Sequence, residues 1–201
     1  MNMSLEQDIK NQYCKFFRES DFAEFKKLAD FYFESAAHLK KDAIQTSIEP
    51  KLLIRNIQKR LYVGIGIELL LKAIYLKNGY GINTEPVQGR QDKYEPYKIN
   101  TSNEDNYNKY STCTLNLLIQ NITNGNVLEV NLPQDIIRGL LIAKVFRNKE
   151  GHIVTREHIF DPENYTDIEN TIIYLYENYF NQKLDFQISM ESNEVSKFNI
   201  N

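Results

Sequence analysis

The segment from Pro50 to Gly79 constrains the fold of this chain more than any other. Pro50 stands where the first turn of a helix tolerates proline, and Gly79 is a typical helix stop. We therefore expect one long central helix between them. Its most apolar part, Val63–Leu76, is interrupted by Glu68 and Lys72 and is shorter than the about 20 residues of a membrane span, so we expect no membrane segment.

The other apolar patterns also follow the helical period. Residues 5–18 and 22–41 carry apolar side chains three and four residues apart, and further helices are expected over 114–122, from about residue 133 to Gly151, and from Asp161-Pro162-Glu163 onward. No alternating run of convincing length indicates a strand. The sequence predicts an all-α fold, a bundle of about four or five core helices.

Two stretches lack either hydrophobic period. Residues 79–111 contain Gly, Asn, Asp, Lys and isolated Tyr with Pro86 and Pro96, which predicts a long inserted loop. Polar residues dominate after Lys183, so we expect a flexible C-terminal tail over residues 186–201. The 201-residue length favours a single domain over residues 1–185.

Composition excludes several classes of protein. The chain has 24 basic and 27 acidic residues and a net charge of -3, so any contact with nucleic acid must come from a local patch. Cys14 and Cys113 have no Cys or His at metal-ligand spacing, and we expect two buried thiols, no metal and no cofactor. The first residues lack a basic segment followed by an apolar run, so we expect a cytoplasmic protein.

One short motif suggests chemistry. Arg147-Asn148-Lys149-Glu150-Gly151-His152 stands at the expected end of a hydrophobic helix. Five residues apart on an unbroken helix, Arg147 and His152 would lie about 140° apart, but Gly151 supplies a break that lets them converge. The arginine can then bind a phosphate while the imidazole moves a proton near neutral pH. This is the minimum for metal-independent cleavage of RNA by its own 2′-hydroxyl.

The motif resembles that of the HEPN superfamily, helical bundles whose catalytic members carry Arg, commonly a polar residue next, and His after four to six intervening residues. Residues 66–77, with a Glu-(apolar)3-Lys-Ala pattern, are similar to an earlier helix of that superfamily. The resemblance covers roughly residues 50–180. It implies an endoribonuclease for single-stranded RNA in defence or as a toxin, with a composite active site in a homodimer and an antitoxin or regulatory partner.

Further site residues follow from helix spacing. Glu68 shares a predicted face with five other residues of the long helix, and we expect it to orient Arg147 or His152; the alternative is a surface pair with Lys72. This face consists of Ile57, Leu61, Gly64, Glu68, Leu71 and Tyr75. Asn148 is expected to position the phosphate. Lys51, Arg55, Lys59 and Lys149 are expected to contact RNA, although charges spaced by four are also typical of a solvated face.

Two other interpretations remain open on the sequence. A catalytically inactive HEPN domain would use Arg147 and His152 to bind a nucleotide or a protein partner. A helical interaction protein would carry the motif by accident. The two glycines of the long helix, Gly64 and Gly66, are interpreted as points of close helix approach rather than as part of a nucleotide-binding loop.

Overall fold

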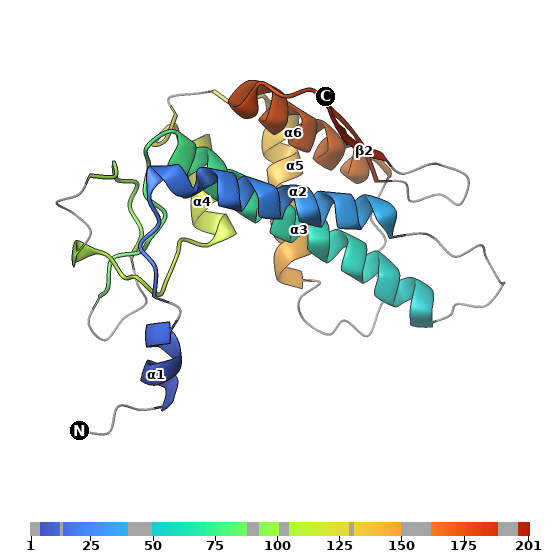
Figure 1. Ribbon diagram of the computed structural model, residues 1–201. Coiled ribbons are helices and arrows are strands. Elements are labelled where there is room, and N and C mark those ends of the chain that lie inside the picture. Colours follow the sequence, from blue (N-terminus) through green and yellow to red (C-terminus); the bar gives the residue numbers. More distant parts are fainter. Residues whose placement is uncertain are drawn as a thin grey trace. The chain divides into compact units, whose positions relative to one another are not determined.

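The computed structural model describes residues 5–12, 14–39, 50–87, 93–100, 105–128, 131–149, 162–188 and 197–201. It is mostly helical, as predicted, with one small sheet (Figure 1). The elements are α1 (Leu5–Gln12), the 3-10 helix η1 (Glu19–Asp21), α2 (Phe22–His38), α3 (Pro50–Lys77), α4 (Leu115–Thr123), α5 (Gln134–Lys149), α6 (Pro162–Phe180), β1 (Leu184–Gln187) and β2 (Lys197–Ile200).

The chain divides into two compact units. Unit 1 contains residues Met1–Phe25 and Leu71–Val130, and unit 2 contains Lys26–Leu70 and Asn131–Asn201. Two of the three boundaries, after Phe25 and after Leu70, fall within α2 and α3, so both helices contribute residues to both units. The sequence predicted one domain over residues 1–185 and gave no sign of these two boundaries, because each lies inside an apolar helix rather than in a linker.

The long helix α3 confirms the expected limits. It begins at Pro50 and ends at Lys77, and Gly79 follows with a φ of 74°, a left-handed conformation that glycine adopts without strain. The Gly79 N–H donates to the carbonyl of Leu76, which closes the helix end. Among the described residues, neither α3 nor any other helix combines the length and apolarity that crossing a membrane requires.

In unit 2, α5 packs closely against α6 because Gly139 has no side chain. A methyl group at that position would lie 2.5 Å from the carbonyl oxygen of Asp167, on the facing turn of α6. The fully buried Thr171 hydroxyl donates to the carbonyl of Ile136 at 3.3 Å across the same contact. Arg138 and Asp167 add an ion pair of 2.9 Å at the edge.

Residues from α2 join α6 and α3 in this unit. The fully buried ring of Phe33 packs against Tyr176 of α6 and fits against Gly66 of α3, where a methyl group would lie 2.5 Å from the ring. The Tyr176 hydroxyl donates to Asp30, and Lys26 pairs with the same carboxylate at 2.9 Å. These contacts confirm Gly66 as a point of close approach.

The C-terminal residues form an antiparallel pair of strands, which the sequence did not predict. Leu184 pairs with Ile200 and Gln187 with Lys197, and β1 packs beside α6 (Figure 1). Alternate residues of β1 are buried, and the backbone N–H that follows the strand, at Ile188, donates to Glu169 at 2.6 Å. This ordered pair corrects the expectation of a flexible tail beginning at residue 186.

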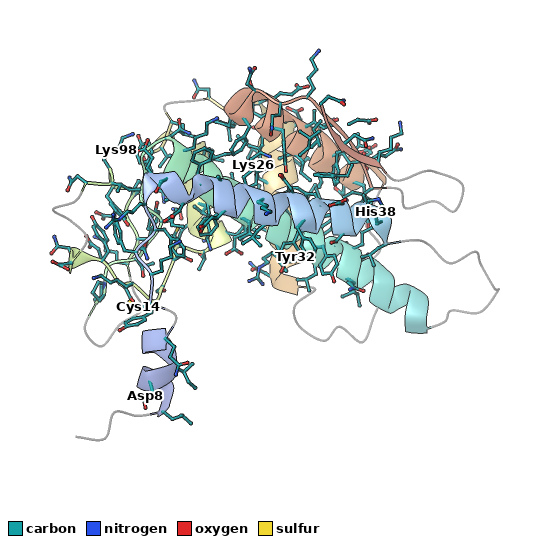
Figure 2. All side chains as sticks on the ribbon, in the orientation of Figure 1. Asp8, Cys14, Lys26, Tyr32, His38 and Lys98 are labelled. Carbon is teal, nitrogen blue, oxygen red and sulfur yellow. The ribbon has the colours of Figure 1, made fainter. Side chains whose placement is uncertain are left out.

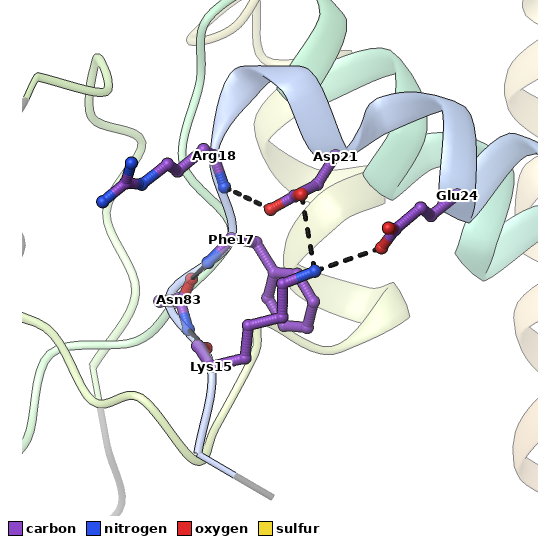
Figure 3. A network of polar contacts seen from close by, with 6 residues as sticks. All are labelled: Lys15, Phe17, Arg18, Asp21, Glu24 and Asn83. Atoms are coloured by element: carbon purple, nitrogen blue, oxygen red, sulfur yellow. Dashed lines mark hydrogen bonds and ion pairs between the residues drawn. The ribbon is translucent and has the colours of Figure 1, made fainter.

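Unit 1 contains the predicted first helix in a shorter form. α1 ends at Gln12, not at Arg18, because the backbone beyond it bonds to Asn83 instead of continuing the helix. The buried Asn83 side chain accepts from the Phe17 N–H and donates to the carbonyl of Lys15 (Figure 3). The Lys15 ammonium bridges Asp21 and Glu24, and its hydrogen bond to Glu24 is the main cause of its raised pKa.

The expected insertion at 79–111 lies in unit 1 and is irregular where it is described. Isolated bridges join Tyr80 to Lys98 and Glu85 to Lys93, and the buried Tyr94 hydroxyl donates to the Gly81 carbonyl at 2.9 Å. Of the two cysteines, Cys113 is buried as expected, whereas Cys14 is exposed.

Candidate active site

The candidate site lies in unit 2, where the C-terminal end of α5 meets α3. The two helices lie close together at Gly64, where an added methyl group would lie 2.7 Å from the backbone nitrogen of Arg147 and 3.0 Å from its Cα. No residue with a side chain fits between the two backbones at this distance. Gly64 therefore allows α5 to place Arg147 directly on α3, as expected for a point of close helix approach.

One turn further along α3, Glu68 receives the side chain of Arg147. The Arg147 Nε–H donates to Glu68 Oε2 at 3.0 Å, with the arginine side chain 41% exposed and the glutamate 17% exposed. A carboxylate this far buried requires a charged or hydrogen-bonding partner. Glu68 was expected to orient Arg147 or His152, and in the structure it pairs with Arg147.

The alternative for Glu68 was a surface pair with Lys72. Lys72 is 7% exposed, and its ammonium group donates to the Thr112 hydroxyl at 3.0 Å. Because Lys72 is buried to this extent, a pair between it and Glu68 would not lie at the surface.

The guanidinium group of Arg147 has two edges, and Glu68 occupies only one of them. Among the described residues, the recorded partner of Arg147 is Glu68, through Nε. The terminal Nη atoms of an arginine held in this way can still donate in a fork to a carboxylate or phosphate. The Arg147 side chain as a whole is partly exposed.

Beneath this contact, a buried arginine of α3 reaches α6. Arg60 lies one turn before Gly64 and is 2% exposed, and its Nη1 lies 3.5 Å from the hydroxyl of Tyr165. The Tyr165 ring contacts Phe146, the residue before Arg147, with centroids 5.9 Å apart. Arg60, Gly64 and Glu68 follow one another at spacings of four, so one face of α3 contacts α6 through Arg60 and the end of α5 through Gly64 and Glu68.

Arg60 and Tyr165 were not predicted from the sequence. The signal that indicates Arg60 is its spacing of four and eight residues from Gly64 and Glu68, which places it on the same helix face. Tyr165 gave no such signal, because its contact with Arg60 joins residues 105 positions apart.

The remaining predicted residues have mixed outcomes. Asn148 is in the last turn of α5 with an exposed side chain. Lys59 is 5% exposed, so its ammonium group cannot follow an RNA backbone at the surface, and the expectation of RNA contact is corrected for this residue. His152 and the side chains of Lys51, Arg55 and Lys149 lie outside the described residues.

Two further checks concern titratable groups among the described residues. His38 lies at the end of α2 with an exposed ring (Figure 2). Its Nδ1 lies 2.9 Å from the carbonyl oxygen of Glu34 in the preceding turn, which is a local contact at the end of the helix. Within the part of the chain that the structure describes, no three His, Cys, Asp or Glu side chains group in a way that could hold a metal ion.

Comparison with protein-family models, with curated proteins and with solved structures finds no match for this chain. The chemistry of the site therefore rests on its own residues and their geometry.

Proposed function

We propose that this protein is a metal-independent endoribonuclease of HEPN type that cleaves single-stranded RNA, in defence or as a toxin. The observation that carries the proposal is the Arg147–Glu68 pair, which fixes a partly exposed guanidinium group at the end of α5. The pair had been expected from the position of Glu68 on α3, together with the Arg147 to His152 motif.

In this function Arg147 binds the scissile phosphate through its free Nη edge. Cleavage places additional negative charge on the phosphoryl oxygens in the transition state, and a positioned guanidinium stabilises that charge. Glu68 reduces the freedom of the side chain before RNA binds, so less entropy is lost on binding. The exposed Asn148 is placed next to Arg147 and adds a donor to the same phosphate.

His152 carries the proton transfer in this proposal. It accepts the proton of the 2′-hydroxyl, the 2′-oxygen bonds to phosphorus, and the bond from phosphorus to the 5′-oxygen breaks. The leaving 5′-oxygen takes up a proton, so the products are a 2′,3′-cyclic phosphate and a 5′-hydroxyl. Lys51, Arg55 and Lys149 are retained as contacts with the RNA backbone, and the buried Lys59 is not.

The proposal includes a homodimer, because one arginine and one histidine make a sparse site and two copies can surround a phosphate. α5 supports this arrangement with two exposed apolar residues four positions apart, Leu141 at 48% and Val145 at 40% exposure, on the helix that ends in Arg147. Sedimentation should give about twice the chain mass at micromolar concentration. A strict monomer would contradict the composite site.

The testing experiment is incubation of a labelled single-stranded RNA with the purified protein in EDTA, followed by analysis of the product ends. We expect fragments with 2′,3′-cyclic phosphate and 5′-hydroxyl ends. Binding of a nucleotide without cleavage would favour the catalytically inactive HEPN domain. If the protein neither cleaves RNA nor binds a nucleotide, the result would favour a helical interaction protein whose partner is a regulatory protein. An obligatory requirement for magnesium would contradict the mechanism.

A further inference from the structure

The contact between Gly64 and Arg147 has a feature that ordinary helix packing does not require. The atoms closest to the missing side chain are the backbone nitrogen and Cα of Arg147 itself, at 2.7 and 3.0 Å, and not the flexible end of a side chain. A backbone cannot turn away from an added methyl group, so such a group would move α5 at the position of Arg147.

Gly64 and Glu68 act on the same residue from two adjacent turns of α3. Gly64 touches the Arg147 backbone and Glu68 binds its Nε, so these two contacts fix both ends of one side chain. Displacement of the backbone would lengthen or misalign the 3.0 Å hydrogen bond, because Glu68 remains in place on α3.

From this geometry we propose that Gly64 is a positioning residue that sets the distance of Arg147 from Glu68 and so the direction of the guanidinium group. The expected effect of Gly64 on the cleavage rate rests on the proposed ribonuclease function. The position of Arg147 can be measured even if the protein does not cleave RNA. Gly64 touches no substrate and acts only through Arg147.

The helix provides a matched control two residues away. Gly66 is equally tight, since a methyl group there would lie 2.5 Å from the ring of Phe33, but that ring belongs to α2 and not to the candidate site. Gly64→Ala and Gly66→Ala therefore make the same chemical change in the same helix, and each places a methyl group too close to a neighbouring residue. Only Gly64→Ala crowds Arg147.

The experiment compares these two variants by RNA cleavage and by the NMR signal of the Arg147 Nε–H. We expect Gly64→Ala to lower kcat by about 10- to 100-fold with a smaller change in KM, since a shift of about 1 Å in a catalytic group has an effect of this order. We expect it also to shift the Arg147 signal. Gly66→Ala should leave that signal in place and retain a kcat close to that of the unchanged protein.

Equal effects of the two variants on kcat and on the Arg147 signal would overturn the proposal, because they would show a general packing defect. If Gly64→Ala does not fold, the test is an NMR measurement on the unchanged protein. A nuclear Overhauser effect between the Gly64 Hα and the Arg147 N–H supports the positioning role, and its absence overturns it. If the unchanged protein does not cleave RNA, the proposed function fails, while the shift of the Arg147 signal still tests the positioning.

Discussion

Arg147 donates its Nε–H to Glu68, and no bond of its terminal Nη atoms is seen among the described residues. The pair is partly buried, so its charges are less screened than those of an exposed ion pair, and each side chain restricts the other. An arginine side chain that is already held by an ion pair loses less conformational entropy when it binds a phosphate than a mobile arginine side chain does. The local chemistry thus favours anion binding at the end of α5.

At the scale of single residues, we predict that Arg147→Ala and His152→Ala each lower RNA cleavage by at least about 10²-fold. This is the usual effect of losing a charge stabiliser or a proton-transfer group. Helix content by circular dichroism should not change. Arg138→Ala is the control, because Arg138 is an exposed arginine of the same helix that pairs with Asp167. Full activity in either site variant, or an equal loss in the control, would contradict the assignment.

Helix spacing led us to expect Glu68 beside Arg147 or His152, of which the structure shows Arg147, but the same reasoning misplaced Lys59. Spacing shows which residues share a face of a helix, and so it placed Glu68 with Gly64. It does not show which faces are covered by other elements, and Lys59 is buried although it belongs to a charged series spaced by four. Arg60 was not predicted for the same reason. Arginine is rarely buried, and helix spacing alone does not show that other elements cover this residue.

At the scale of elements, α2 and α6 are joined by a small polar network inside an apolar contact. Asp30 accepts from the Tyr176 hydroxyl and pairs with Lys26, whose ammonium group also lies 4.9 Å from the centre of the Tyr176 ring. Tyr176 is fully buried, and burial is the main cause of its raised pKa. The carboxylate therefore satisfies a hydroxyl that water does not reach.

We predict that Asp30→Ala lowers the free energy of unfolding by about 1–3 kcal/mol, because it leaves a buried hydroxyl and a half-buried cation without their acceptor. Urea unfolding followed by circular dichroism measures the change. Glu34→Ala, at an exposed position of the same helix, should stay within about 0.5 kcal/mol of the unchanged protein. Similar values for the two variants would show that the network does not contribute.

Elements with strong local signals were predicted well, and those that depend on distant partners were not. α3 and α6 begin at Pro50 and Pro162, and both proline positions were read from the sequence. β1 and β2 have four residues each and pair across an intervening polar stretch, so neither shows a convincing alternation alone. α1 is shorter than predicted because Asn83, far along the chain, binds the backbone that follows it.

At the scale of the whole molecule, each compact unit contains tyrosines that prefer to stay protonated. Burial raises the pKa of Tyr94 and Tyr97 in unit 1 and of Tyr176 in unit 2, and it raises the pKa of Tyr179 in unit 2 to about 12. An unfolded chain has tyrosines with a pKa of about 10. Above that pH the unfolded state loses protons that the folded state retains.

We predict that stability is constant near neutral pH with respect to these groups and falls as the pH rises above about 10. The sign follows because a raised tyrosine pKa means that the folded state binds more protons, so deprotonation favours unfolding. For Tyr179 the loss extends to about pH 12. Urea unfolding at pH 8 and 11 measures it, and Tyr179→Phe should reduce the difference. An unchanged pH dependence in that variant would contradict the assignment to Tyr179.

The central claim, that Glu68 and Arg147 act as one unit in RNA cleavage, is tested most directly by a double-mutant cycle on kcat/KM. The account predicts a loss of at least about 10²-fold for Arg147→Ala and a smaller loss for Glu68→Ala. It predicts that the double variant is no less active than Arg147→Ala alone, since Glu68 has no role once its arginine is removed. Losses that multiply in the double variant, or full activity of Arg147→Ala, would contradict the claim.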